Sequence, residues 1–208
     1  MKISIQFLIP IFGSILFVVL YIIATYYYPG GSNMDRQAVG FHWNTNYWCD
    51  LTSTIAKNGE PNSAQPIALT AMIILAASLS VFWLVAPKIF PTLRKLYIFI
   101  PIFGIGAMIA SCFIFTHFHD LMMNIGSIMG FAAIVILLFG LFSFHFYKLF
   151  WGAIGCLILI GINNFIYYTH YLIDYLPIIQ KVSFCFILFW LSSYCWVGYQ
   201  KTNTIRRK

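Results

Sequence analysis

The stretch FTHFHDLMMN, residues 115–124, places two histidines and an aspartate within four positions between two long apolar segments. Imidazole and carboxylate groups are costly inside a membrane, so their presence there points to a binding or catalytic role. A similar stretch, YTHY at 168–171, is followed shortly by a second aspartate. Neutral imidazole and carboxylate suit zinc, and a catalytic zinc site needs about three protein ligands plus an open position. The candidate metal ligands are His117, His119, Asp120, His170 and Asp174.

A zinc ion held by these side chains would make its bound water a nucleophile near neutral pH, able to attack an ester or amide at headgroup level. His117, Asp120 and His170 are the candidate catalytic residues for that hydrolysis. The sequence has no H-E-x-x-H motif and no H-x-x-x-H pair. Two other interpretations therefore stay open. In one, the histidines lie at the water boundary and the aspartates cap helices. In the other, they belong to a binding or permeation site for a polar ligand or a proton.

Helical spacing adds further polar side chains to this region. A helix that continues past residue 116 would carry 117, 120 and 124 on one face, and a helix that reaches residue 174 would carry 163, 167, 170 and 174 on another. Polar side chains in spans usually face the bundle interior. We therefore expect a polar pocket on the outer side of the membrane. The residues predicted to bind a ligand there are His42, Asp50, Asn124, Ser127, Asn163 and Tyr167.

The elements that must position these residues are membrane-spanning helices. Only 8% of the 208 residues are charged, against about 25% in a typical soluble domain. Apolar runs of about 20 residues, enough to cross a bilayer, recur without the alternation of β-strands. The predicted spans are about 5–26, 66–86, 95–116, 123–147, 149–170 and 177–199. The sequence thus predicts an all-α, polytopic membrane protein, a six-transmembrane-helix bundle that forms a single transmembrane domain over residues 1–208.

The distribution of charge predicts the orientation of this bundle. With the N-terminus in the cytoplasm, all of the 12 basic residues except Arg36, Lys57 and Lys181 fall inside, so the positive-inside rule places both termini in the cytoplasm. The same threading sends all five acids and four of the five histidines outward, where we expect any chemistry. The net charge of +7 is then a topology signal and a contact for anionic lipid headgroups, and no nucleic-acid partner is expected.

The longest connection, about residues 28–65, is predicted to lie on the outer side. Loops of this length are often lids or binding loops. Its segment GFHWNTNYWCDL interleaves four aromatic rings with polar side chains that include His42 and Asp50. Rings with polar edges favour the membrane–water boundary, so the segment is either an aromatic belt that anchors the loop or a lid over a binding site.

The motifs YPGGS, NYWCDL with NGEPN, and THFHDLMMNIGS resemble a bacterial six-span membrane family of unknown function, over nearly the whole chain. That family is distantly similar to the alkaline ceramidase and progestin-receptor-like superfamily of membrane hydrolases. The resemblance implies a zinc site of three histidines with an aspartate and a serine, in which the outer histidines and Asp120 would take part. The chain departs from the superfamily by its six predicted spans instead of seven, and by a last span without histidine.

From these observations we predict a non-catalytic or sensory protein of the bacterial cytoplasmic (inner) membrane that binds a lipid headgroup or small polar ligand from the outer side. Membrane lipids are its expected partners. One alternative is a metal-dependent hydrolase of lipid amides or esters with zinc as cofactor. Another is a structural or assembly subunit of a membrane complex. A homo-oligomer is compatible with each of these functions.

Overall fold

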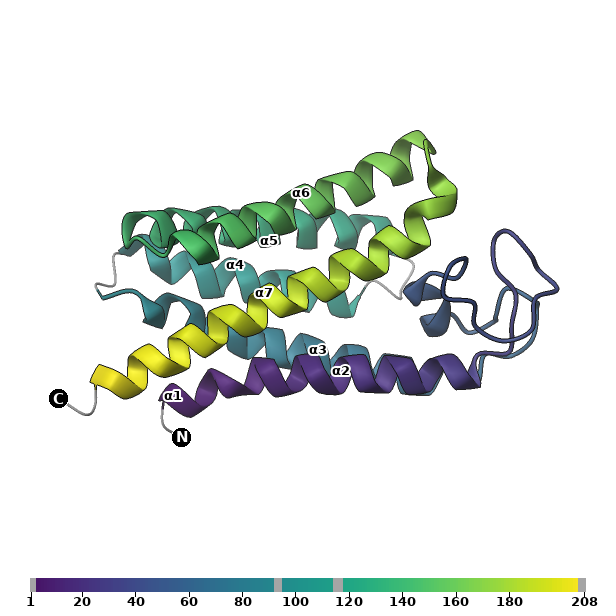
Figure 1. Cartoon of the computed structure of the whole chain (residues 1–208), viewed down its shortest axis with the longest axis horizontal. Helices are drawn as coiled ribbons and strands as arrows, with labels where there is room; N and C mark the ends of the chain where they lie inside the picture. The colour runs from purple at the N-terminus through teal and green to yellow at the C-terminus, as the bar shows by residue number, and fades with distance from the viewer. Residues whose placement is uncertain (1–2, 92–94, 114–117, 206–208) are drawn as a thin grey trace. The chain divides into compact units, whose positions relative to one another are not determined.

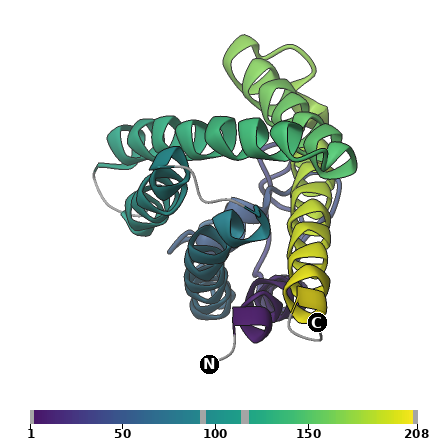
Figure 2. The same cartoon turned by 90° about the vertical axis from the view of Figure 1, so that its left-hand side faces the viewer.

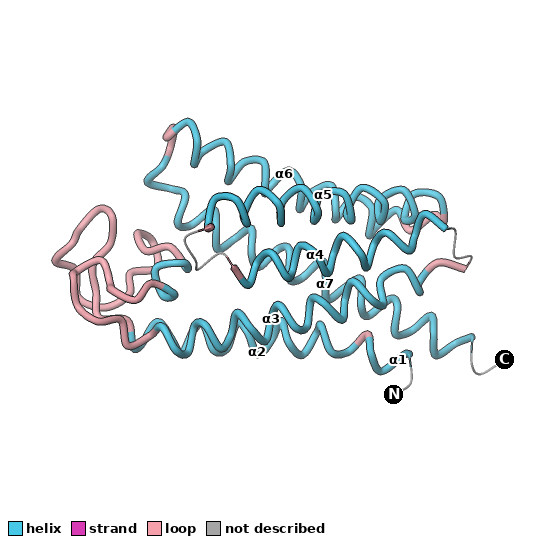
Figure 3. Tube along the Cα trace, turned by 180° about the vertical axis from the view of Figure 1, so that it is seen from behind, coloured by secondary structure: helices cyan, strands magenta, loops and turns pink. Residues whose placement is uncertain are grey.

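The computed structural model describes residues 3–91, 95–113 and 118–205, and its regular elements in these ranges are helices (Figures 1 and 3). The α-helices are α1 (Ile3–Gln6), α2 (Leu8–Tyr27), α3 (Gln65–Val85), α4 (Phe99–Cys112), α5 (His119–Ser143), α6 (Tyr147–Thr169) and α7 (Leu176–Ile205). Short 3-10 helices are η1 (Trp48–Thr52), η2 (Ala86–Ile89), η3 (Lys95–Ile98) and η4 (Ile173–Tyr175). The predicted all-α fold is confirmed for the described residues.

Five helical segments of the described chain are long and apolar enough to cross a membrane, which indicates a multi-pass membrane protein. They are Ser4–Tyr27, Gln65–Ile89, Leu121–Ser143, Tyr147–Thr169 and Ile173–Thr204. The span predicted over 95–116 corresponds to a shorter apolar helical segment, Lys95–Ser111. Residues 114–116 of that predicted span lie outside the described residues. The count of six spans therefore stays a prediction.

The chain folds into two compact units. Unit 1 comprises 1–14, 73–154 and 190–208, and unit 2 comprises 15–72 and 155–189. Unit 1 thus holds the ends of the chain and all of α4 and α5. Unit 2 holds the α2–α3 loop (residues 28–64), the α6–α7 connection (residues 170–175) and the helix segments that adjoin them. The single domain over 1–208 stays a prediction.

Prolines mark where several helices begin. Pro66, Pro101 and Pro177 lie in the first turns of α3, α4 and α7, where a backbone N–H has no intrahelical acceptor to lose. Pro10 lies third in α2, and its missing N–H leaves the carbonyl four residues earlier without its helical donor. The short break between α1 and α2 lies within this interval, at Phe7.

The α2–α3 loop, the longest loop of the described chain in Figure 3, is folded by its own hydrogen bonds. Two antiparallel bridges, Gly30 with Val39 and Ile55 with Pro61, close two turn segments. The segments are joined because the Asn58 N–H donates to the Gly30 carbonyl at 3.1 Å. This part of the chain is therefore a small folded structure, although it contains no long helix.

Gly31 permits the close approach of the two turn segments. Its φ of +80° lies in the left-handed region that favours glycine. A Cβ atom at this position would stand 2.3 Å from the backbone nitrogen of Asn58, which lies in the second segment. Because that neighbour is backbone, the loop could accept a side chain at residue 31 only by separating the segments.

A Gly31→Ala substitution is therefore expected to open the α2–α3 loop, measured as faster limited proteolysis within residues 28–64 of the protein in mild detergent. The matched control is Gly59→Ala, because Gly59 also has a positive φ, +91°, but no atom within 4 Å of its added Cβ. Both variants carry backbone strain of about 1–3 kcal/mol, whereas only the first adds the steric clash. Equal proteolysis of the two variants would contradict this account of the loop.

Candidate functional site

Asn46 lies at the centre of the folded loop. Its side chain is fully buried, and its Nδ2 group donates to the Gly31 carbonyl at 2.7 Å and to Asp50 Oδ2 at 3.1 Å. Its Oδ1 atom accepts the backbone N–H of His42 at 2.9 Å. A buried amide is tolerated when its donors and acceptor are satisfied, as they are here. Asn46 thus joins three stretches of the loop.

Asp50 is a buried carboxylate, with 3% of its surface exposed. Besides Asn46, its Oδ2 atom accepts the backbone N–H of Tyr47 at 2.9 Å. The Lys57 ammonium lies 3.8 Å from Oδ1 and is the only cation within ion-pair distance among the described residues. These partners offset the free-energy cost of burying the carboxylate. Asp50 therefore links Asn46, Tyr47 and Lys57 within the loop.

Lys181 connects the loop to α7 within unit 2. Lys181 lies in an apolar span, and only 9% of the residue is exposed. Its ammonium group donates to the carbonyl of Asn46 and to that of Pro177, the latter at 2.9 Å. The ring of Phe41 stands 5.6 Å from the ammonium nitrogen. A charged group in a span is costly unless protein groups replace its water. The loop supplies two of these groups, and we call this contact the Lys181 anchor.

An aromatic cluster supports the Lys181 anchor from the side of α2. Trp48 is 5% exposed, and its ring lies 5.9 Å from Phe17, 5.3 Å from Tyr21 and 5.4 Å from Phe184, between ring centres. The backbone N–H of Trp48 also donates to the side-chain oxygen of Gln180 on α7, at 3.2 Å. The α2–α3 loop is therefore fixed to α7 by both apolar packing and hydrogen bonds.

Polar groups from three segments of unit 2 lie near enough to Tyr47 to affect the pKa of its hydroxyl. Burial raises the pKa of the Tyr47 hydroxyl above its ordinary value, and negative charge at Cys49, Asp50 and Asp174 raises the pKa further, as does Tyr167. The interacting groups come from the loop, from η4 and from the end of α6. Tyr47, Tyr167 and Asp174 form what we call the loop-edge polar group.

Of the residues predicted to bind a ligand, the four in unit 2 have different environments. Asp50 is buried as described, whereas His42 is exposed with its Nε2 atom 3.2 Å from the Val39 carbonyl. Tyr167 is 60% exposed. Asn163 joins α6 to α7, because its Nδ2 group donates to Ser183 Oγ at 2.6 Å. Tyr167 belongs to the loop-edge polar group, and ligand binding by all four stays a prediction.

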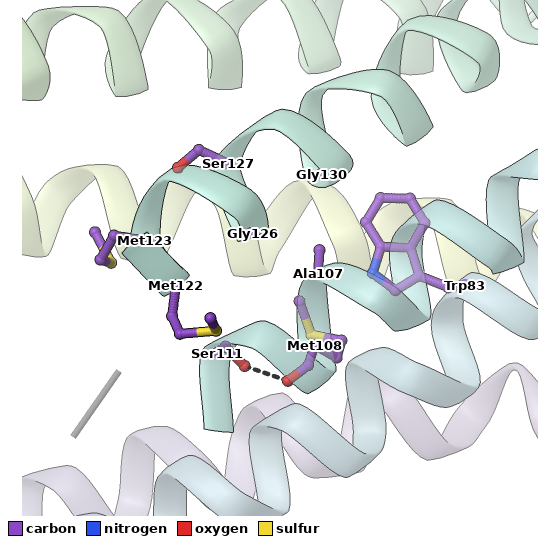
Figure 4. Close-up of a pocket in the computed structure, with 9 residues that line it drawn as sticks. All are labelled: Trp83, Ala107, Met108, Ser111, Met122, Met123, Gly126, Ser127 and Gly130. Carbon is purple, nitrogen blue, oxygen red and sulfur yellow. Dashed lines mark hydrogen bonds between the residues drawn. The ribbon is translucent and has the colours of Figure 1, made fainter. Parts of the chain in front are cut away.

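The other two predicted ligand-binding residues, Asn124 and Ser127, lie on α5 in unit 1. Both are exposed, and Ser127 lines a cavity of about 220 Å³ between α3, α4 and α5 (Figure 4). The cavity is formed mainly by apolar and small side chains. Its lining residues are Trp83, Ala107, Met108, Ser111, Met122, Met123, Gly126, Ser127 and Gly130.

The candidate metal ligands are described only in part. His117 lies outside the described residues, and His119 and Asp120 begin α5 with side chains that are not described. His170 and Asp174 are exposed, and they do not share a continuous helical face, because α6 ends at Thr169 and His170 adopts φ +56°. The described part of the chain contains no group of three or more His, Cys, Asp or Glu side chains placed to hold a metal. The zinc site stays a prediction.

Sequence reasoning did not identify Lys181 and Asn46 as members of a shared network. A lysine near the start of an apolar run is itself a signal, because such a residue is costly without a partner. The partner could not be found from spacing, because Asn46 lies 135 positions away in a loop. Sequence reasoning also did not identify Trp83, which lines the cavity in unit 1.

The Lys181 anchor is expected to stabilise the loop more than the partly exposed Lys57–Asp50 ion pair does. Lys181→Met should destabilise loop closure by about 2–3 kcal/mol, because hydrogen bonds from a charged group are lost. Lys57→Met, which removes a partly exposed ion pair at 3.8 Å, should cost less than about 1 kcal/mol. Amide hydrogen exchange over residues 41–52 measures both effects, and similar exchange in the two variants would refute the anchor.

In comparisons with known proteins, no family model, no curated protein and no solved structure matches this chain. The resemblance to a six-span bacterial family therefore stays a prediction, and function is argued from the chain's own residues.

Proposed function

We propose that this chain is a non-catalytic multi-pass membrane protein that binds a lipid headgroup or a small polar ligand at the loop-edge polar group of unit 2. The observation that carries the proposal is that Asp174 on η4 and Tyr167 on α6 lie near enough to Tyr47 on the loop to raise the pKa of its hydroxyl. Side chains from the loop, η4 and α6 therefore lie near one another there. A hydroxyl and a carboxylate, together with a second hydroxyl, can accept and donate hydrogen bonds to a polar ligand.

The contacts that hold the loop to α7 and α2 support the same proposal. A site on a flexible connection would have to be ordered by its ligand, which weakens binding. Here the Lys181 anchor and the aromatic cluster hold the loop through contacts that need no ligand. The position of Tyr47 is fixed in addition by its backbone bond to Asp50. The loop-edge polar group is therefore preorganised on the side of the loop.

Exposed tyrosines around this part of unit 2 favour a ligand at the level of the headgroups. Tyr26 at the end of α2 is 83% exposed, Tyr168 at the end of α6 is 74% exposed, and Tyr171 beyond it is 66% exposed. Tyrosine rings with a polar tip favour the membrane–water boundary. The negative charge of Asp174 and the aromatic rings together favour an amine-bearing headgroup over an anionic one.

The proposal is tested by native mass spectrometry of delipidated protein that is offered equal amounts of phosphatidylethanolamine and phosphatidylglycerol. Wild type is expected to retain the ethanolamine lipid preferentially, and a Tyr167→Phe/Asp174→Asn variant to lose about tenfold in affinity, since a bond to a charged group contributes about 1.5–3 kcal/mol. The control is Tyr168→Phe, an exposed neighbour outside the loop-edge polar group. Equal retention of both lipids, or an equal loss in the control, would contradict the proposal.

Elemental analysis distinguishes the proposal from the metal-dependent hydrolase. Tag-free protein is supplied with zinc and compared with a His117→Ala/His170→Ala variant. The binding proposal expects the two samples to contain the same amount of metal. Near-stoichiometric zinc that disappears in the variant would replace the proposal with hydrolysis of lipid amides or esters.

We further propose six crossings of a bacterial inner membrane with both termini in the cytoplasm. Within unit 1, the N-terminal α1 and the C-terminal end of α7 lie on the same side (Figure 2). Phe7 packs there so closely on α7 that a Cβ at Gly198 would stand 2.4 Å from its ring. An even number of crossings brings the two chain ends to one side of a membrane. All of the 12 basic residues except Arg36, Lys57 and Lys181 belong to unit 1.

Epitope accessibility tests this orientation. An epitope inserted after Gly59, which has no atom within 4 Å of an added Cβ, should bind antibody on intact spheroplasts. Epitopes at the N- and C-termini should bind only after the membrane is permeabilised. Opposite accessibility of the two termini would show an odd number of crossings and would overturn the six-span arrangement.

A further inference from the structure

The cavity of unit 1 contains a buried hydrogen-bond donor that no described protein group uses. Trp83, near the end of α3, is 7% exposed, and its indole Nε1–H has no hydrogen-bond partner among the described residues. Buried polar groups are nearly always hydrogen-bonded, so an unpaired donor calls for an explanation. Trp83 also lines the cavity of about 220 Å³ between α3, α4 and α5.

The indole ring is held in place by α4. A Cβ atom at Gly104 would lie 2.2 Å from the Trp83 ring, so the ring rests directly on the backbone of α4. Figure 4 shows the indole nitrogen on the edge of the ring that faces Ala107 and the rest of the cavity lining. The fixed ring therefore presents its N–H group to the cavity.

The remaining lining gives the cavity its chemical character. Met108, Met122 and Met123 line it, and methionine side chains adapt to irregular apolar ligands. Ser111 keeps its hydroxyl on the Met108 carbonyl at 2.6 Å. Gly126 faces Ala110 across the contact of α4 with α5, where an added Cβ would be 3.5 Å from that methyl group. The cavity thus combines one fixed donor with an adaptable apolar wall and no charged lining residue.

The size of the cavity suits a ring or a short segment of hydrocarbon. An engineered apolar cavity of about 150 Å³ stays dry and binds benzene, and this cavity is larger at about 220 Å³. Met123 is 44% exposed, so the lining reaches the surface of unit 1 beside the apolar exterior of α5. A ligand dissolved in hydrocarbon can approach by that side.

We propose that the cavity between α3, α4 and α5 binds an uncharged apolar molecule that carries a carbonyl oxygen, and that the Trp83 Nε1–H group donates a hydrogen bond to that oxygen. The carbonyl oxygen supplies the acceptor that the described protein lacks, and the hydrocarbon of the ligand fills the methionine-lined space. The carbonyl belongs either to a ring, as in a benzoquinone, or to an acyl ester of a lipid. This site is distinct from the loop-edge polar group and does not depend on it.

The test uses full-length protein in mild detergent with ¹⁵N-labelled tryptophan, whose six indole signals are observed by NMR. The signal that is missing in Trp83→Phe identifies Trp83. Three probes are added: a decyl-substituted benzoquinone, methyl dodecanoate, and dodecylbenzene as the hydrocarbon without a carbonyl group. A carbonyl probe is expected to shift the Trp83 signal downfield, whereas dodecylbenzene leaves the N–H group unpaired. A larger effect of the quinone indicates a ring carbonyl, and a larger effect of the ester indicates an acyl group.

Variants separate the hydrogen bond from the space that the ligand fills. Trp83→Phe keeps a ring on Gly104 but has no N–H, so it should lose about fivefold in affinity for the carbonyl probe and none for dodecylbenzene. Ser111→Phe, which fills the cavity, should abolish binding of both. Trp151→Phe is the matched control, because Trp151 is 66% exposed and outside the cavity. Unchanged binding in both cavity variants, or no carbonyl-dependent shift of Trp83 in wild type, would overturn the proposal.

Discussion

A polar group away from water must find a partner within the protein, and this constraint governs the chain from its helices to its loop. Helices satisfy the backbone groups of the apolar spans from within. Hydroxyl side chains in the spans bond to a carbonyl one turn earlier, as Ser14 does to Pro10 and Ser80 to Ala76. Asn163 goes further, because its amide group bonds the Ser183 hydroxyl and so joins α6 to α7 in unit 2. The Asn163–Ser183 hydrogen bond is therefore also a contact between two helices.

The same constraint explains how the α2–α3 loop is bound to α7 within unit 2. Lys181 in α7 carries a charge that hydrocarbon does not solvate, and the carbonyl of Asn46 on the loop meets that need. The Asn46 side chain then bonds Asp50 and Gly31, so an interaction that begins in a span continues into the loop. Gly31 provides the close backbone approach that this network requires. Within unit 2, the single charged side chain of Lys181 therefore connects the apolar helix α7 to the polar α2–α3 loop.

At Trp83 the constraint is not met, and there the structure points to a ligand. Among the described residues, buried side-chain donors without a partner belong to Trp48, Trp83 and Tyr97. Trp48 is enclosed by the aromatic cluster of unit 2, whereas Trp83 faces a cavity. An unsatisfied donor beside open apolar space can be satisfied by a molecule with an apolar body and one acceptor atom. The two proposed sites differ accordingly, because a group of polar side chains forms one and a single donor in apolar surroundings forms the other.

The sequence by itself determined the class of the protein. Long apolar runs with few charges predict membrane-spanning helices, because a helix satisfies its own backbone hydrogen bonds in hydrocarbon. The sequence also located several helices to within a few residues, as for the span predicted over 149–170 and found as the apolar helix Tyr147–Thr169, whereas the segment predicted over 95–116 is a shorter helix, Lys95–Ser111. It did not determine which polar residues meet, because spacing along one helix says nothing about a loop partner 135 positions away, as with Lys181 and Asn46. Nor could helical spacing foresee the end of α6 at Thr169, which separates His170 and Asp174 from the predicted face. Only the tertiary structure decided these contacts, because they depend on where the chain turns and on which buried groups must satisfy one another.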